Sequence, residues 1–195
     1  MVAEKQIINF KNVFDTPFSD KLRTWRNQDF VRLKMVNQDV ITEEQHIKYL
    51  EKIRKDEKSK IYIAFDNAVP FGVVIFTINA EENYIEPAQY LINESFLGKG
   101  YGKIIKYAQN NYIFRIFPDG EMRTKILQHN TVTLGLNHKM GAQIRCTEKF
   151  KDENGLTREA YVLYLNASMW QEKRPMILSE IKAKHNDIII EEIID

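Results

Sequence analysis

Three glycines at alternate positions, Gly98, Gly100 and Gly102, lie where a strand-like segment is followed by a helix-like one. Residues 88–92 before them are rich in strand-forming side chains, and residues 103–114 after them carry apolar side chains at helical spacing. Glycine has no Cβ, so it permits the left-handed backbone angles of a sharp turn. A strand that turns directly into a helix indicates an α/β fold, in which helices pack on a sheet.

Hydrophobic periodicity predicts the order of the other elements. Residues 42–45 (Thr-Glu-Glu-Gln) have the pattern of a capping box, which predicts a helix start. The expected elements are a strand at 7–10, helices at 21–35 and 42–55, strands at 61–65, 71–76 and 88–92, a helix at 103–114, a strand at 124–127, a helix at 130–140, strands at 143–150 and 159–165, and a helix from residue 168. This order predicts one mixed α/β (α+β) domain.

The composition is typical of a folded, water-soluble domain. A chain of 195 residues is long enough for one well-filled core, and 28 Lys and Arg residues nearly balance 27 Asp and Glu residues. The formal net charge of +1 gives no support to nucleic-acid binding, so any anion site is expected to be local. We recognise no signal peptide and no membrane-spanning run, which predicts a cytoplasmic protein without a membrane partner.

The rarer side chains predict neither disulfides nor metal binding. Cys146 is the single cysteine, which excludes an intramolecular disulfide and fits a reducing compartment. We expect its side chain to be buried as a small apolar residue. The four histidines form no close ligand pair, so no metal site is predicted.

The glycine loop, residues 97–102 (Leu-Gly-Lys-Gly-Tyr-Gly), is a candidate phosphate site. The start of a helix has unpaired N–H groups and a dipole that favours anions, and Lys99 and Lys103 add positive charge. The P-loop order Gly-x-x-x-x-Gly-Lys-Ser/Thr is absent, and the alternating glycines do not fit the dinucleotide fingerprint Gly-x-Gly-x-x-Gly. By itself, the loop is equally compatible with an ordinary turn from a strand into a helix.

Two segments of the chain resemble the GCN5-related N-acetyltransferase family. The glycine loop is similar to the family's Arg/Gln-x-x-Gly-x-Gly/Ala pattern, with Leu97 where Arg or Gln is usual. Further on, Asn130 begins a helix that ends in Lys-Met-Gly at 139–141, as the last helix of the family does. Asn137 stands where that family usually has a tyrosine.

A third segment, residues 25–27 (Trp-Arg-Asn), resembles one branch of the family. This branch contains ribosomal-protein N-terminal acetyltransferases and the amino-sugar N-acetyltransferase of the pseudaminic acid pathway. The resemblance implies a domain at 1–167 with a central mixed, mostly antiparallel sheet, flanked by helices and splayed at the acyl-CoA site. Residues 168–195 are expected to form a helical extension that packs on the domain or lies in a homodimer interface.

The resemblance also implies a cofactor, acetyl-CoA, and direct attack of a primary amine on its thioester. Leu91 and Ile92 lie on the strand that is expected to hold the pantetheine arm, and we expect the Ile92 N–H to meet the thioester carbonyl. The residues expected to be catalytic are Ile92, Asn137 and Glu86. Those expected to bind the cofactor are Leu91, Ile92, Leu97, Gly98, Lys99, Gly100, Tyr101, Gly102, Lys103, Asn130 and Asn137.

The proton transfers have several candidates. Asn137 cannot give the leaving thiolate the proton that the family's tyrosine supplies, although its amide could still bind the sulfur. Water could protonate the thiolate, and the side chains that could replace the tyrosine are Tyr90, Tyr101 and His138. A chain of waters could deprotonate the amine, and the candidates for a general base are Glu86, Glu94 and Glu148.

The acceptor is the least determined part of the prediction. The residues expected to bind it are Trp25, Arg26, Asn27 and Met35. Arg26 could meet a phosphate or carboxylate of the acceptor, or it could pair with a nearby carboxylate such as Asp29. We favour a nucleotide-linked amino sugar as the small-molecule acceptor, with a protein N-terminus as the alternative. Because the usual tyrosine is absent, a non-catalytic acyl-CoA-binding module stays open.

Overall fold

The computed structural model describes residues 5–151 and 155–194. Within them, one sheet has eight strands in the order β6-β7-β5-β4-β3-β2-β1-β8. Neighbouring strands are antiparallel except for β1 with β8 and β4 with β5. The strands are β1 (Ile7–Asn12), β2 (Ser59–Asp66), β3 (Val69–Asn79), β4 (Tyr84–Leu91), β5 (Glu121–Leu127), β6 (Gln143–Lys151), β7 (Thr157–Asn166) and β8 (Ile189–Ile190). The predicted single α/β domain with a mixed, mostly antiparallel sheet is confirmed.

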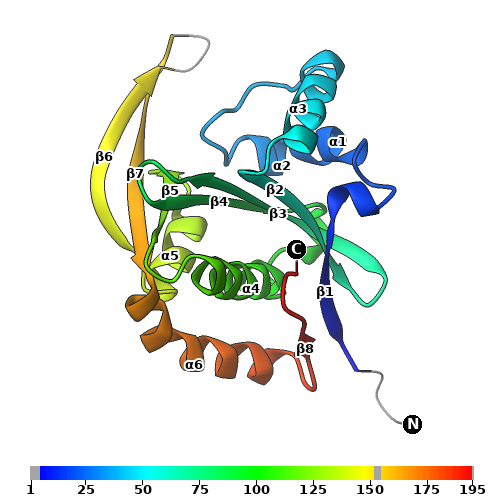
Figure 1. Ribbon diagram of the computed structural model, residues 1–195, viewed down its shortest axis with the longest axis vertical. Helices are drawn as coiled ribbons and strands as arrows, with labels where there is room; N and C mark the ends of the chain where they lie inside the picture. Colours follow the sequence, from blue (N-terminus) through cyan, green and yellow to red (C-terminus); the bar gives the residue numbers. More distant parts are fainter. Residues whose placement is uncertain (1–4, 152–154, 195) are drawn as a thin grey trace.

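Helices cover both faces of the sheet (Figure 1). α1 to α3 lie on one face, whereas α4 and α6 lie on the other. The helices are α1 (Lys21–Asn27), α2 (Asp29–Arg32), α3 (Glu43–Lys55), α4 (Tyr101–Ile116), α5 (Thr131–Lys139) and α6 (Ala167–Lys184), with short 3-10 helices η1 (Val13–Asp15) and η2 (Glu94–Phe96). In the described part of the chain, none of them is both long and apolar enough to cross a membrane.

The helix expected at 21–35 is broken, and that prediction is corrected. Gln28 has extended backbone angles (φ −60°, ψ 136°) and separates α1 from α2. Its Nε2 donates to Trp25 O at 3.1 Å and to Ile92 O at 3.0 Å. The second bond joins the helix region to the end of β4, so a contact between distant segments outweighs the local helical pattern.

The capping box expected at 42–45 is confirmed at the start of α3. Gln45 N donates to Thr42 Oγ1 at 3.2 Å, and Thr42 N donates to Gln45 Oε1 at 2.8 Å. This reciprocal pair satisfies two backbone donors that the first turn of a helix leaves unpaired. The start of α3 is therefore fixed by its local sequence.

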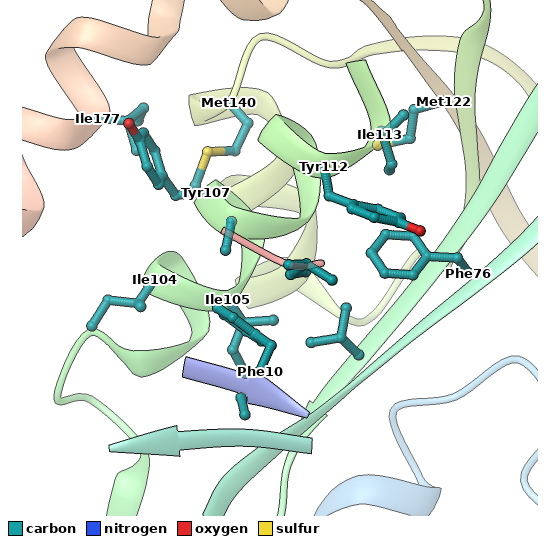
Figure 2. Close-up of a cluster of buried hydrophobic side chains, with 14 of the residues drawn as sticks. Phe10, Phe76, Ile104, Ile105, Tyr107, Tyr112, Ile113, Met122, Met140 and Ile177 are labelled. Carbon is teal, nitrogen blue, oxygen red and sulfur yellow. The ribbon is translucent and has the colours of Figure 1, made fainter. Parts of the chain in front are cut away.

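The larger core lies between the sheet, α4 and α6 (Figure 2). Tyr112 of α4 packs on Phe76 of β3 with ring centroids 4.6 Å apart, and Tyr107 packs on Trp170 of α6 at 5.6 Å. Trp170 is buried in this core, as are four other side chains of the C-terminal segment, Ile177, Ile181, Ile188 and Ile193. Residues from 167 onward are therefore part of the main core.

Cys146 is exposed, so the expectation that it is buried is wrong. It lies on β6, an edge strand that pairs only with β7 and whose side chains are mostly exposed. An edge strand outside the helical layers has no second surface to bury its residues. Within the described residues, no group of three or more His, Cys, Asp and Glu side chains could hold a metal ion.

β4 and β5 separate after a short stretch of parallel pairing. Their ladder consists of Tyr84 with Glu121 and Ile85 with Met122, although the two strands have 8 and 7 residues. We call the diverging segments, 86–91 of β4 and 123–127 of β5, the β4–β5 splay. The expected splay of the sheet is confirmed. It leaves backbone groups along two strand edges without a neighbouring strand.

Candidate functional site

The glycine loop joins η2 to α4 through two left-handed residues. Gly98 has φ +72°, and Gly100, the N-cap of α4, has φ +96°. A Cβ built on Gly98 or Gly102 would meet no other segment within 4 Å, whereas one on Gly100 would lie 2.9 Å from His185 Nε2. The loop therefore has an open outer side and a covered inner side, and glycine is required at Gly100 by both its φ and this close approach.

The outer side of the loop carries unpaired backbone donors. In the part of the chain that the structure describes, no acceptor receives a hydrogen bond from the N–H groups of residues 98–102. These groups lie at the start of α4, a helix of 16 residues whose dipole is positive at this end. Free amides at a helix start, without covering side chains, can bind a phosphate ester.

The two lysines predicted to assist the loop differ in whether their charges are already paired. Lys99 is exposed beside the free amides. Lys103 forms an ion pair with Glu180 of α6, and Lys139 Nζ lies 3.0 Å from the same carboxylate. Lys99 is therefore the available charge at the loop, whereas the charge of Lys103 is already paired. Leu97, which replaces the family's Arg or Gln, is exposed and adds no charge.

Polar side chains of α4 contact both strands of the splay. Gln109 Nε2 donates to Ala88 O on β4 at 3.1 Å, and Lys106 Nζ donates to Gln109 Oε1 at 3.2 Å. Lys106 Nζ is also 3.7 Å from Met122 Sδ on β5, at the last paired position of the ladder. Lys106 is not among the residues expected from the sequence, although a lysine among the apolar residues of a helix expected to be buried is a usable signal.

Lys106 is a buried amine with only 3% of its surface exposed. Burial lowers the pKa of Lys106 to about 7, because removal from water disfavours the charged form. A large fraction of this side chain is therefore neutral at pH 7. A neutral amine is compatible with an apolar α4 face, whereas a charged one would need a partner.

The Ile92 N–H is already paired, which corrects the role expected for it. It donates to Phe71 O on β3 at 3.1 Å, so the antiparallel pairing continues one residue beyond the end of β4. A donor used in this way cannot also meet a thioester carbonyl. Leu91, the last residue of β4, is partly buried against the core below α4.

The side chains of Asn130 and Asn137 form hydrogen bonds within the protein. Asn130 is the N-cap of α5: its Oδ1 accepts from Thr133 N at 3.3 Å, and its Nδ2 donates to Lys34 O at 3.1 Å. Asn137 is 3% exposed, and its Nδ2 donates to Thr133 O at 2.9 Å. Its buried Oδ1 has no partner among the described residues. Asn130 thus has a structural role, and Asn137 keeps one acceptor free.

Arg26 and Asn27 hold the connection between α2 and α3. We call this connection, residues 33–41, the acceptor loop. Arg26 Nη2 donates to Asn37 O at 2.5 Å. Asn27 Oδ1 accepts from Ile41 N at 2.9 Å, while its Nδ2 donates to Ile41 O at 2.8 Å. Both side chains therefore fix the backbone of the acceptor loop near its C-terminal end.

The other end of the acceptor loop is held by residues that follow β5. His129 Nε2 lies 3.4 Å from Leu33 O, and Asn130 Nδ2 donates to Lys34 O. These two residues follow β5, whereas α1 and α2 are joined to the end of β4 by the Gln28–Ile92 hydrogen bond. The acceptor loop thus reaches from the end of β4 to the end of β5, on the face opposite α4.

The remaining residues expected to bind the acceptor have different surroundings. Trp25 packs on Phe18 with ring centroids 5.7 Å apart, as part of the smaller core below α1 and α3. Met35 lies in the acceptor loop and is partly exposed. Trp25 is thus mainly a core anchor, while the side chain of Met35 is partly open to solvent.

Arg26 and Tyr90 lie close together on this face. Burial raises the pKa of Tyr90, although the nearby charge of Arg26 acts in the opposite direction. Arg26 Nη1 is buried and has no hydrogen-bond partner among the described residues. Glu86, two residues beyond Tyr84 on β4, is exposed and lines a groove at the β3–β4 hairpin. The acceptor face therefore brings together an unpaired cationic donor and a protonated phenol, whereas Glu86 lies apart from them, toward the hairpin end of β4.

Two other proton-donor candidates are already hydrogen-bonded. The Tyr101 hydroxyl donates to Asp66 Oδ2 at 2.5 Å, and burial together with this carboxylate raises the pKa of Tyr101 to about 12. His138 Nδ1 lies 3.0 Å from Ala142 O, just beyond its own helix. Tyr101 and His138 thus contribute to local structure, and Tyr90 is the candidate on the acceptor face.

No protein-family model matches this chain, and no curated protein matches its sequence. Several solved structures are similar to this chain. A spermidine N-acetyltransferase from Vibrio cholerae, in complex with CoA and spermine, is similar with a TM-score of 0.74 and 13% identity, over 84% of this chain and 98% of that one. An aminoglycoside acetyltransferase, AAC(6')-Ib, in complex with coenzyme A has a TM-score of 0.67 and 17% identity, over 86% and 99%.

A third solved structure is the Campylobacter jejuni N-acetyltransferase PseH, with a TM-score of 0.58 and 20% identity, over 82% of this chain and 97% of that one. Identities this low establish the arrangement of the elements and leave the chemistry to be argued from the residues. The three solved structures share the arrangement of elements with this chain over 82–86% of its length. The chain therefore has the fold of the GCN5-related N-acetyltransferases.

Proposed function

We propose that the chain is an acetyl-CoA-dependent N-acetyltransferase. The observation that carries this proposal is the run of unpaired N–H groups at residues 98–102, at the start of α4 and close to the β4–β5 splay. A helix start of this kind suits a pyrophosphate. Unpaired strand edges suit an extended, amide-containing arm. Coenzyme A combines both groups, so the residues present fit this cofactor.

Each part of the site would then hold one part of the cofactor, which supplies an acetyl group activated as a thioester. The N–H groups of 98–102 bind the pyrophosphate, and the exposed Lys99 adds charge beside it. Leu91 and the unpaired edge of β4 position the arm in the splay. The free Oδ1 of Asn137 can accept a hydrogen bond from an amide of the arm.

The reaction requires the removal of one proton and the addition of another. The acceptor amine must be neutral to form the N–C bond, and Glu86 is an exposed carboxylate on β4 that can take its proton directly or through water. As the C–S bond breaks, the thiolate needs a proton. Tyr90 keeps its hydroxyl proton at neutral pH, since burial raises its pKa, and it can supply that proton. No covalent enzyme intermediate is needed.

The acceptor that we propose is an amine carrying an anionic group, specifically a nucleotide-linked amino sugar. The supporting observation is Arg26, whose Nη1 is buried without a partner and whose side chain has no carboxylate partner among the described residues. An unpaired guanidinium favours a phosphate and disfavours a polycation such as a polyamine. The likeness of residues 25–27 to the amino-sugar branch of the family points the same way.

Two alternatives remain distinct from this proposal. A protein N-terminus could enter between the acceptor loop and β4, in which case Arg26 would pair with an acidic residue of the peptide. A non-catalytic CoA-binding module is favoured by two observations. The tyrosine position holds Asn137, and the Ile92 N–H is already used. Both alternatives keep the CoA site and differ in what reacts there.

A coupled assay of CoA release tests the proposal. The protein is mixed with acetyl-CoA and, in separate reactions, UDP- and dTDP-linked amino sugars, N-terminal peptides, spermidine and an aminoglycoside. We expect turnover with a nucleotide-linked amino sugar and little with spermidine. Turnover only with peptides would establish the first alternative. CoA binding measured by calorimetry, without turnover on any amine, would establish the second.

We also propose a cytoplasmic location. Cys146 is an exposed free thiol, and a reducing compartment protects such a thiol from oxidation. A homodimer stays a prediction, which light scattering of the purified protein tests.

A further inference from the structure

The end of α6 and the residue after it bind the inner side of the glycine loop. Lys184 Nζ donates to Gly98 O at 2.6 Å, and His185 Nε2 donates to Lys99 O at 2.9 Å. His185 also covers Gly100, because a Cβ there would lie 2.9 Å from its Nε2. The C-terminal segment thus supports a loop that has few side chains to support itself.

Carbonyl groups that are held on the inner side turn the N–H groups outward. In a trans peptide the C=O and N–H bonds point in opposite directions, and no described peptide bond is cis. The bond after Gly98 pairs the Gly98 carbonyl with the Lys99 N–H, and the next pairs the Lys99 carbonyl with the Gly100 N–H. Both of these N–H groups are unpaired.

We infer that Lys184 and His185 form a C-terminal clamp that presents the Lys99 and Gly100 N–H groups to the pyrophosphate of coenzyme A. The inference rests on the proposed function for the identity of the ligand. It makes these two residues positioning residues, since they act through the backbone of the glycine loop. It also gives the C-terminal segment a role in the cofactor site.

Both ring nitrogens of His185 have contacts that hold the imidazole in place. Its Nε2 faces the Lys99 carbonyl oxygen, and its Nδ1 lies 3.0 Å from Gln6 Oε1. Gln6 is held in turn, because its Nε2 donates to Asp66 Oδ2 at 2.7 Å. The imidazole is therefore fixed from two sides.

Side chains from two other elements enclose the imidazole. Asp66 of β2 binds Gln6 and also accepts from the Tyr101 hydroxyl of α4. The Tyr101 ring lies edge-on to the imidazole, with centroids 5.8 Å apart. β2 and α4 therefore help to hold His185 against the glycine loop.

Loss of the His185 side chain would loosen the glycine loop. The Lys99 carbonyl would lose its hydrogen bond, and the N–H groups of Lys99 and Gly100 would no longer be held outward. We expect the dissociation constant of CoA to rise by about fivefold in His185→Ala, which is the size expected for one hydrogen bond.

The test measures CoA binding by calorimetry for the wild type, His185→Ala, His185→Gln and Lys182→Ala. His185→Ala should bind CoA about fivefold more weakly than the wild type. His185→Gln keeps an amide that can donate to the Lys99 carbonyl, so it should recover part of the loss. Lys182 is an exposed neighbour on α6, and its variant should bind CoA as the wild type does. Unchanged CoA binding in His185→Ala would overturn the clamp.

A second readout needs no cofactor. In the unliganded protein, the amide NMR resonances of Lys99 and Gly100 should move in His185→Ala relative to the wild type and stay in place in Lys182→Ala. If they move in His185→Ala while the wild type fails to bind CoA, the clamp stands and the proposed function fails. If CoA binds but the two amides do not respond to His185, the clamp is wrong and the proposed function stands.

Discussion

The two faces of the β4–β5 splay each carry a cation without a carboxylate partner, and the two cations behave differently. On the α4 face, Lys106 is 3% exposed and binds Gln109 Oε1. On the acceptor face, Arg26 binds Asn37 O and has a buried Nη1 without a partner among the described residues. A buried lysine can lose its proton, whereas arginine stays charged. The α4 face can therefore become neutral, while the acceptor face keeps a charge for a ligand to pair.

The two faces also differ in which groups they offer. The glycine loop on the α4 side offers backbone N–H groups, and its carbonyl oxygens are held by Lys184 and His185. The acceptor loop has backbone groups that are already bound by Arg26 and other side chains, so what it offers is its own side chains. A site built from backbone depends on a few glycines, whereas a site built from side chains can change its specificity with single substitutions.

The largest expected effect is on stability, in Lys106→Met. Burial lowers the pKa of Lys106 to about 7, below its value in the unfolded chain. Between these two values the unfolded chain binds a proton that the folded chain does not, so the free energy of unfolding rises with pH in this window. The methionine variant lacks this contribution. We therefore compare the free energy of unfolding of the variant with that of the wild type. The variant's advantage should be larger at pH 7 than at pH 10, by on the order of 4 kcal/mol.

Urea unfolding of both proteins between pH 6 and pH 10 measures this difference. Lys103→Met is the matched control, since Lys103 is on the same helix but is partly exposed and paired with Glu180. Its stability should change in the opposite direction, because it loses a favourable pair. If the difference between Lys106→Met and the wild type does not depend on pH, Lys106 is charged in the folded protein and the contrast between the two faces disappears.

The next effect concerns the backbone of the glycine loop, in Gly100→Val. Gly100 has φ +96°, and a side chain there would meet His185. A left-handed angle costs a branched residue about 2 kcal/mol, so CoA should bind roughly 30-fold more weakly as the loop rearranges. Calorimetry checks this value. Gly135→Ala in α5, where a Cβ would meet nothing within 4 Å, should leave CoA binding unchanged.

A smaller effect is expected on the acceptor face, in Arg26→Met. If the unpaired Nη1 binds an anionic group of the acceptor, KM for a nucleotide-linked amino sugar should rise about tenfold, with little change in KM for acetyl-CoA. Arg26→Lys keeps the charge but loses the planar fork, so it should recover only part of the loss. Steady-state kinetics with both substrates separates the two faces. An equal rise in both KM values would instead indicate that Arg26 only supports the acceptor loop.

The sequence predicts the α4 face, where the site is built from backbone groups, better than it predicts the acceptor face. The turn at Gly98 to Gly102 and the capping box at Thr42 follow from glycine chemistry and local hydrogen bonds, both of which involve neighbouring residues. The splay joins segments far apart in the chain and is expected from the family resemblance alone. Lys106 was visible as a lysine in an apolar helix, but its contact with Met122 depends on how β5 diverges from β4.

Contacts between distant segments account for what the sequence did not predict. The break at Gln28 depends on Ile92, which lies 64 residues further on. The pairing of the Ile92 N–H depends on strand register, which periodicity does not determine to a single residue. The clamp joins His185 to Lys99 across 86 residues, and no local pattern marks His185 as a partner of the glycine loop.

The smallest effect is expected in Asn27→Ala, which separates loop support from ligand contact. Asn27 uses both its Oδ1 and its Nδ2 in hydrogen bonds to Ile41, so its role is to hold the acceptor loop. Removing it should lower the free energy of unfolding by about 1 kcal/mol, measured by urea denaturation, with KM for the acceptor rising about threefold. Asn186→Ala, at an exposed asparagine outside this loop, should change neither value. A loss of acceptor binding as large as that of Arg26→Met would mean that the acceptor face depends on loop position more than on the charge of Arg26.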